Sequence, residues 1–167
     1  MNSKNPKSPL RKAHELLYDL HACQSWQELE QFGLGRLHEI FGASRSSWTE
    51  FVDQKNFNYT EWSADHKHLK GEYTPVIKQY LQLQHPLITN FDPADRWTQT
   101  YRITDFFSQR EFEKTELYNE GYLPTGIRHQ ITMQAHVSAY GFTTFSVSRL
   151  DKAISDSERE IFDCLQP

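Results

Sequence analysis

The stretch TELYNEGYLPTGIRHQITM, residues 115–133, decides the fold because it contains both the end of a helix and the start of a strand. Gly121, Pro124 and Gly126 form turns, and they follow a segment, SQREFEKTELYNEGY (108–122), that has the spacing of an amphipathic helix. We therefore expect the chain to leave a helix, turn a corner at these three residues and enter a strand.

The strand after this corner shows a regular alternation of apolar and polar residues. The segment GIRHQITMQAHV (126–137) predicts one face with Ile127, Ile131, Met133, Ala135 and Val137, and an opposite face with Arg128, Gln130, Thr132, Gln134 and His136. His129 is a polar exception on the apolar face. The short turn SAYG leads to FTTFSVSRL (142–150), which we interpret as the second strand of a hairpin.

The N-terminal part indicates two helices and another hairpin. Apolar residues recur at helical spacing from Leu10, and Ser25 with Glu28 forms a capping-box pattern that starts a second helix ending near Gly42. Gly33 and Gly35 weaken the middle of that helix, which indicates either a break or a close packing contact. The runs 44–52 and 56–63 then predict two strands joined by a short polar turn.

The remaining segments alternate between helix and strand. Residues 75–88 have helical character that Pro86 interrupts, residues 98–103 predict a strand, and Ser155 with Glu158 predicts the start of a last helix. Strand hairpins joined by helices favour an α+β domain on an antiparallel sheet flanked by helices.

Composition restricts the class of protein. The chain has 167 residues, a formal net charge of −4 and a pI near 6.0, so it lacks the basic character of a nucleic-acid-binding domain. Its two cysteines, Cys23 and Cys164, are too few for a disulfide framework, and no segment has the length of a signal peptide or a membrane span. We expect a soluble cytoplasmic protein. The aromatic content, 14%, is high, and such rings fill cores more often than they line pockets.

The C-terminal half, residues 85–167, resembles a known family. The run RITDFFSQREFEKTELYNEGYLPTGIRHQITM followed by ISDSEREIFDCLQP is similar to the GAF-like N-terminal sensor domain of bacterial LuxR-type transcriptional regulators. The matching residues are Asp105, Phe106, Leu117, Tyr118, Asn119, Glu120, Tyr122, Pro124, Gly126, Gln130, Ser155, Glu158 and Arg159.

This resemblance implies a GAF/PAS-like fold and a regulatory function. Residues 1–9 are expected to be a flexible arm, and residues 10–167 a single sensor domain without the helix-turn-helix DNA-binding domain that follows such sensors in the family. The last helix is expected to reach the end of the sequence, which suggests that the sequence represents the sensor region alone. The family implies a small-molecule effector, a homodimer, and contact with DNA only through the absent domain.

In GAF-like domains the ligand lies between the sheet and the segments that cover one of its faces, here residues 73–97 and 105–122. The predicted ligand-binding residues are Trp48, Trp62, Tyr73, Tyr80, Phe91, Trp97, Tyr118, Tyr122, His129 and Met133. His129 has an alternative interpretation as a core histidine that is bonded to a backbone carbonyl or to a tyrosine. The tryptophan, tyrosine and aspartate set of acyl-homoserine-lactone sensors has no convincing counterpart in this sequence.

No other chemistry is indicated. Asp65, His66 and His68 lie in a polar, lysine-flanked segment that is typical of a solvated turn rather than a metal site. No catalytic motif is present, so we expect no enzyme activity, no metal and no cofactor. The alternative to a ligand sensor is a dimerisation module with a filled core and no ligand.

Overall fold

The structure is a computed structural model, and it describes residues 8–51, 57–63, 79–81, 83–89, 100–137 and 142–165. At its centre is an antiparallel five-stranded sheet with the strand order β2-β1-β5-β4-β3. The strands are β1 (Arg45–Phe51), β2 (Phe57–Ser63), β3 (Thr100–Arg102), β4 (His129–Val137) and β5 (Phe142–Arg149). Both expected hairpins form, and the predicted α+β class with an antiparallel sheet and flanking helices is confirmed.

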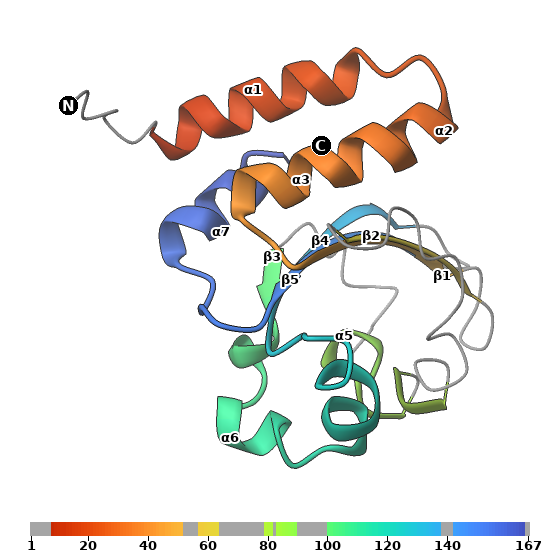
Figure 1. Ribbon diagram of the computed structural model, residues 1–167, viewed down its shortest axis with the longest axis vertical. Helices are drawn as coiled ribbons and strands as arrows, with labels where there is room; N and C mark the ends of the chain where they lie inside the picture. Colours follow the sequence, from red (N-terminus) through yellow and green to blue (C-terminus); the bar gives the residue numbers. More distant parts are fainter. Residues whose placement is uncertain are drawn as a thin grey trace.

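One face of the sheet is covered by helices from the two ends of the chain. These are α1 (Pro9–His21) and α3 (Leu34–Phe41), drawn above the sheet in Figure 1, and α7 (Asp156–Asp163), drawn to the left of it. Apolar side chains from the helices and from this face of the sheet form the larger core, which includes Leu16, Leu34, Leu37, Phe41, Trp48, Ile131, Met133, Val147, Ile161 and Phe162.

Local capping sets the ends of these helices as the sequence predicts. Ser25 Oγ accepts a hydrogen bond from the backbone N–H of Glu28 at 3.1 Å, and the short helix α2 (Trp26–Glu28) starts there. Gly42 adopts a left-handed conformation, with φ of 56°, immediately after α3. Ser155 and Glu158 form the expected capping box at the start of α7.

The second helix passes through its glycines without a break. A π-helical turn, η1 (Leu29–Gly33), joins α2 to α3. A β-carbon built on Gly33 would lie 2.9 Å from Cδ2 of Leu20, so the glycine permits close packing of α1 against this helix. At Gly33 the structure therefore has the close packing contact, the second of the two alternatives.

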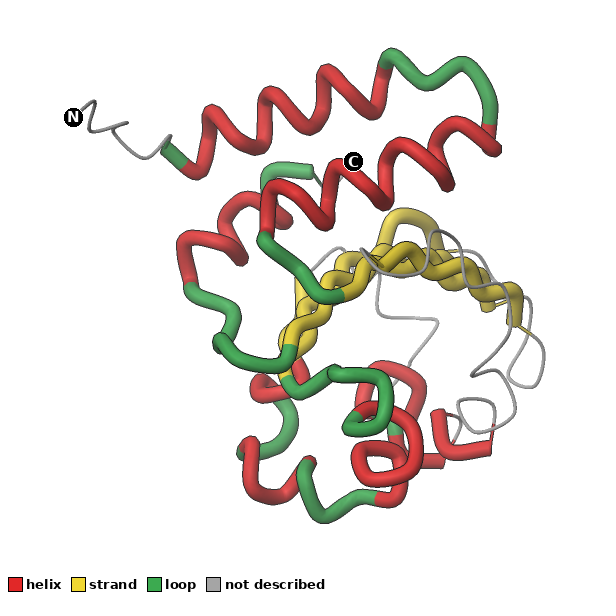
Figure 2. The backbone as a smooth tube through the Cα atoms, viewed as in Figure 1, coloured by secondary structure: helices red, strands yellow, loops and turns green. Residues whose placement is uncertain are grey.

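Shorter segments lie on the opposite, hollow side of the curved sheet (Figure 2). They comprise the helical residues 79–81 and 83–84, α5 (Pro86–Thr89), η2 (Ile103–Asp105), α6 (Gln109–Phe112) and the π-helical η3 (Leu117–Tyr122). Their apolar side chains form a second, smaller core, which contains Leu81, Ile103, Phe112, Leu117, Tyr118, Tyr122 and Ile127. We call these segments, together with His85 and the corner residues 123–127, the cover.

The helix expected over residues 108–122 is divided into α6 and η3. Thr115 Oγ1 donates to the carbonyl of Phe112 at 2.7 Å and accepts from the backbone N–H of Tyr118 at 3.1 Å, so the threonine ends one turn and begins the next. This division lets both Tyr118 and Tyr122 pack edge-on against the ring of Phe112, with centroid distances of 5.4 and 5.5 Å. The corner then closes at Gly126, where φ is 73°.

The alternation predicted for β4 is present at its centre, where Ile131 and Met133 face the larger core and Gln130, Thr132 and Gln134 face the cover. Ile127 precedes the strand and packs in the smaller core, on the other side of the sheet. A register shift between Gln134 and His136 marks a β-bulge opposite β5. Residues 1–7 of the expected N-terminal arm lie outside the described residues, and α1 begins at Pro9.

Candidate ligand-binding site

The two faces of the sheet differ in chemistry, although both are buried. The face toward α1, α3 and α7 is apolar, as the larger core shows. The face toward the cover instead carries hydroxyl groups at the centre of three adjacent strands. These belong to Ser47 and Thr49 of β1, Thr132 of β4, and Thr144 and Ser146 of β5, each with at most 7% of its surface exposed.

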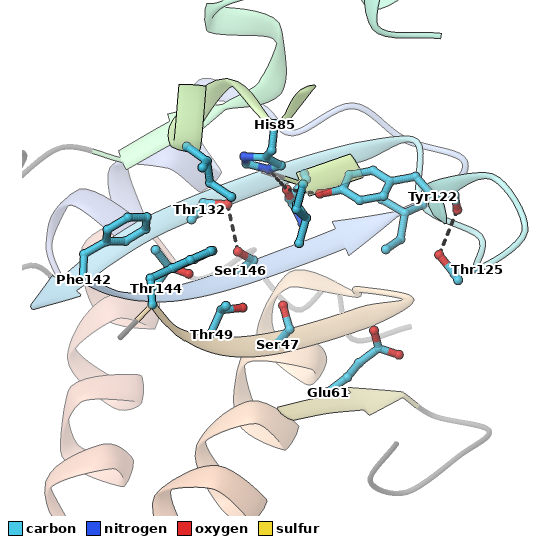
Figure 3. A pocket seen from close by; sticks show the side chains of 15 residues that line it. Ser47, Thr49, Glu61, His85, Tyr122, Thr125, Thr132, Phe142, Thr144 and Ser146 are labelled. Carbon is cyan, nitrogen blue, oxygen red and sulfur yellow. Dashed lines mark hydrogen bonds between the residues drawn. The ribbon is translucent and has the colours of Figure 1, made fainter. Parts of the chain in front are cut away.

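A cavity of about 50 Å³ lies between this polar face and the cover (Figure 3). The sheet contributes Ser47, Thr49, Phe51, Glu61, Gln130, Thr132, Phe142, Thr144 and Ser146. The cover contributes Leu81, His85, Ile88, Tyr122, Thr125 and Ile127. The cavity therefore has a mainly polar floor and a mixed roof, in which Leu81, Ile88 and Ile127 are apolar.

The floor hydroxyls are only partly paired with one another. Thr132 Oγ1 and Ser146 Oγ are 2.8 Å apart and share one hydrogen bond. The hydroxyls of Ser47, Thr49 and Thr144 form no hydrogen bond with any other residue of the described ranges. Their oxygen atoms are not among the buried side-chain atoms of the described residues that lack a partner, so they are open to the cavity and can bond to a molecule inside it.

Gln130 connects the floor to the roof through a buried network. Its side-chain oxygen accepts a hydrogen bond from the hydroxyl of Tyr122 at 3.2 Å and lies 3.2 Å from Nε2 of His85, and its amide nitrogen donates to Ser148 Oγ at 3.2 Å. An amide oxygen only accepts, so the neutral imidazole carries its proton on Nε2. Because Gln130 lies on β4, Ser148 on β5, Tyr122 in η3 and His85 just before α5, the network holds the cover against the sheet.

Burial keeps both roof groups of this network uncharged. It lowers the pKa of His85 to about 4, and the hydrogen bond to Gln130 opposes this shift in part. Burial also raises the pKa of Tyr122 well above its usual value. At neutral pH the imidazole and the phenol are therefore neutral hydrogen-bonding groups.

Glu61 is the one ionised group among the described residues that line the cavity, and it is neutralised locally. Its carboxylate forms an ion pair with the guanidinium of Arg45, whose side chain also donates to the carbonyl of Thr125 at 2.5 Å. Arg45 thereby ties the edge of the sheet to the corner that follows η3. The cavity carries little net charge as a result.

Three of the sequence-predicted ligand residues lie in or near this cavity. Tyr122 lines it, while Tyr118 packs behind Tyr122 in the smaller core. Tyr80 is half-buried and packs against the same core. Ligand contact by Tyr118 and Tyr80 stays a prediction.

Three others point elsewhere. Trp48 and Met133 belong to the larger core, on the opposite face of the sheet from the cavity. His129 borders a separate hollow of about 160 Å³, together with Arg102, Arg128 and Ile154. Burial lowers the pKa of His129, and the charges of Arg128 and Arg149 lower it further.

The side chains of the remaining four lie outside what the structure describes. Tyr73, Phe91 and Trp97 lie outside the described residues, as do Asp65, His66 and His68. Trp62 belongs to β2, where its backbone pairs with Ser46 of β1. Ligand contact by all four residues stays a prediction.

Sequence reasoning did not select the polar floor or His85. The available signal was the set of serines and threonines at alternate positions of two strand-like runs, SRSSWTEF and FTTFSVSR. At those positions a strand that is buried on both faces would normally carry valine or isoleucine. Attention to aromatic rings alone therefore missed these hydroxyl groups.

The described residues show neither a metal-binding cluster nor a membrane-spanning helix. No group of three histidine, cysteine, aspartate or glutamate side chains in these ranges is arranged to hold a metal ion. No helix in the same ranges has the length and the apolar character needed to cross a lipid bilayer.

The fold is similar to those of solved ligand-binding domains. The ligand-binding domain of VqsR from Pseudomonas aeruginosa is 18% identical over 95% of this chain and 88% of its own, with a TM-score of 0.60. CepR2 from Burkholderia cenocepacia, an N-acylhomoserine-lactone-dependent LuxR-family transcription factor, is 10% identical over 90% of this chain and 84% of its own, with a TM-score of 0.61.

A GAF domain also matches. The GAF domain of a phosphoenolpyruvate-protein phosphotransferase from Coxiella burnetii is 9% identical over 92% of this chain and 85% of its own, with a TM-score of 0.51. No protein-family model and no curated protein matches the chain significantly. At these identities the likeness establishes the fold. The expected resemblance to the GAF-like sensor domains of LuxR-type regulators is confirmed at that level.

Proposed function

We propose that this chain is the sensor domain of a LuxR-type transcriptional regulator and that it binds a small-molecule effector in the cavity between the sheet and the cover. The observation that carries the proposal is the set of hydroxyls on Ser47, Thr49 and Thr144, which line the cavity and bond to no other described residue. The similarity of the fold to the VqsR and CepR2 domains supports the assignment to this class of regulator.

The position of the cavity explains how binding of an effector can affect regulation. Its floor belongs to the sheet and its roof to the cover, so a bound effector contacts both layers at once. An effector shifts an equilibrium only if it binds one state better than the other. An effector that bridges the layers favours the state in which the cover is closed, and a helix-turn-helix domain connected to this one can respond to that change in the cytoplasm.

A binding screen with a matched pair of variants tests this function. A ligand at about 100 times its dissociation constant adds roughly 2.7 kcal/mol to the free energy of unfolding, which thermal-shift screening with a metabolite set detects. Thr144→Leu fills the cavity and should abolish the shift, whereas Thr143→Leu, on the opposite face of β5, should leave it intact. A ligand that stabilises all three proteins equally would place binding outside the cavity.

A specific surface favours dimerisation as a second function of the same domain. Leu10 and Tyr18 lie on one side of α1, and 70% and 73% of their respective surfaces are exposed. A homodimer formed through α1 of two copies would bury these side chains and match the two-fold symmetry of helix-turn-helix binding sites. Light scattering should show a dimer that the double variant Leu10→Asp, Tyr18→Asp converts to a monomer; an unchanged mass would exclude this surface.

A further inference from the structure

We propose that the cavity takes a small, uncharged molecule rich in hydroxyl groups, about the size of a triol or a pentose. The inference rests on the proposed function, because it names the class of effector for the same cavity. It depends on the spacing of the floor hydroxyls, their unpaired state, the charge of the lining and the size of the space.

The floor presents its hydroxyls in two rows across the sheet. The backbone register sets Ser47 beside Ser146, and Ser146 beside Thr132. Two residues further along, Thr49 lies beside Thr144. Neighbouring strands are about 4.8 Å apart, and alternate residues of one strand are about 6.8 Å apart. One ligand hydroxyl can therefore bridge Ser47 and Ser146 while another bridges Thr49 and Thr144.

Three of these floor hydroxyls lack partners despite their burial. The residues are 7% exposed for Ser47, 7% for Thr49 and 4% for Thr144, and their hydroxyls bond to no other described residue. Each of these hydroxyls can donate one hydrogen bond and accept two, and none of their oxygen atoms is among the buried side-chain atoms without a partner, so they are open to the cavity. A ligand that both donates and accepts at several points satisfies this floor, as the hydroxyls of a polyol do.

The charge of the lining argues against an ionic ligand. None of the described residues that line the cavity carries a positive charge at neutral pH, since His85 is held neutral by burial. A carboxylate or phosphate would therefore enter without a counter-charge, at a large desolvation cost. Glu61 is already paired with Arg45, so it offers little to a cation.

The shape of the cavity argues against a long acyl chain. A volume of about 50 Å³ holds roughly three to five water molecules, which matches a compact ligand. Methylene groups laid on the floor would leave its hydroxyls unpaired. At one end of the cavity Phe51 and Phe142 stack with centroids 4.3 Å apart, and the apolar C–H face of a sugar or polyol can pack there.

Three sets of probes distinguish the ligand classes on the purified chain. The neutral set is glycerol, erythritol, D-ribose and L-arabinose; the anionic set is D-glycerate and D-ribose 5-phosphate; and the acyl set is N-butanoyl- and N-octanoyl-L-homoserine lactone. Binding is measured by titration calorimetry and by ligand-observed NMR at millimolar or lower concentrations, where general stabilisation by polyols is small. Thr49→Val and Thr144→Val each remove one floor hydroxyl with almost no change in shape, and Thr143→Val is the control on the opposite face.

We expect at least one neutral probe to bind, with affinity at least about tenfold weaker in Thr49→Val and Thr144→Val and unchanged in Thr143→Val. Binding of an anionic or acyl probe instead, lost in Thr144→Val, would overturn the ligand class and leave the proposed sensor function intact. If no probe of any set binds, the cavity holds only water and this inference fails together with the ligand-binding part of the proposed function. Thermal unfolding of each variant confirms that it is folded.

Discussion

At the scale of single residues, Thr144 shows how a binding site can cost stability. Its hydroxyl faces the cavity and bonds to no other residue in the described part of the chain. Replacement by valine keeps the shape and removes the unpaired group. We therefore expect Thr144→Val to raise the free energy of unfolding of the ligand-free protein by about 1 kcal/mol. Chemical denaturation measures this change, and a loss of stability would mean that the hydroxyl has a structural partner.

His85 makes stability depend on pH. Its pKa is about 4 in the folded chain, against about 6.5 when exposed, so the unfolded chain binds more protons between these values. The contribution of His85 to the free energy of unfolding is therefore fully present above pH 6.5. It is lost as the pH falls toward 4, and the loss is on the order of 3 kcal/mol.

The variant His85→Gln isolates this effect, because glutamine keeps a hydrogen-bond donor for Gln130 and does not titrate. Unfolding curves measured from pH 7 to pH 4 should be flatter for the variant than for the natural chain. Carboxylates also titrate at the acid end of this range, but they contribute equally to both proteins. Equal slopes in the two proteins would show that His85 is not buried as a neutral group.

At the scale of elements, the corner between η3 and β4 depends on one glycine. Gly126 has φ of 73°, and a β-carbon there would meet no atom within 4 Å. A substitution at Gly126 therefore lowers the free energy of unfolding through the strained backbone conformation, and not through a clash with neighbouring atoms. We expect Gly126→Ala to lower the free energy of unfolding by about 1 kcal/mol, and Gly126→Asn to lower it less, because asparagine tolerates the left-handed region better.

Denaturant titration of the two Gly126 variants checks this order. If alanine and asparagine were equally harmful, the left-handed backbone would not be the cause. The corner is also fixed by Arg45, which bonds to the carbonyl of Thr125, so neither substitution should unfold the chain. Gly42 also has a left-handed backbone conformation, but it lies at the end of a helix and not at this corner. The same substitutions at Gly42 therefore provide a comparison.

At the scale of the whole molecule, the two layers on the sheet should differ in stability. The layer of α1, α3 and α7 packs on an apolar face, whereas the cover packs on a polar one with a cavity between them. Apolar burial is the main stabilising term, so the cover should open at a lower free energy than the rest.

Hydrogen exchange in low concentrations of denaturant measures this difference. Amides of η3 and of residues 83–89 should exchange through local opening, while those of α3 and the central strands β1 and β5 should exchange only on global unfolding. A single opening energy for all segments would mean that cover and sheet form one cooperative unit, which would weaken the proposed response to an effector.

The sequence by itself determined the elements of this protein, because their signals are local. Ser155 with Glu158 predicts the start of α7, and Gly42 predicts the end of α3. Alternation predicts both hairpins and the apolar face of β4. Each of these features depends on residues within one or two turns of each other, so no knowledge of distant contacts is needed.

Only the tertiary structure decided the site. Ser46 and Ser47 are adjacent and alike in sequence, yet Ser46 donates to the carbonyl of Leu34 in the helical layer while Ser47 faces the cavity. The segments that pack on the two faces of β1 decide which serine faces the helical layer and which faces the cavity. His85 and Gln130 are 45 residues apart and meet because the cover folds across the sheet. A site built from hydroxyls of three strands and a roof from another layer depends on register and layer packing, and neither is encoded within a short stretch of sequence.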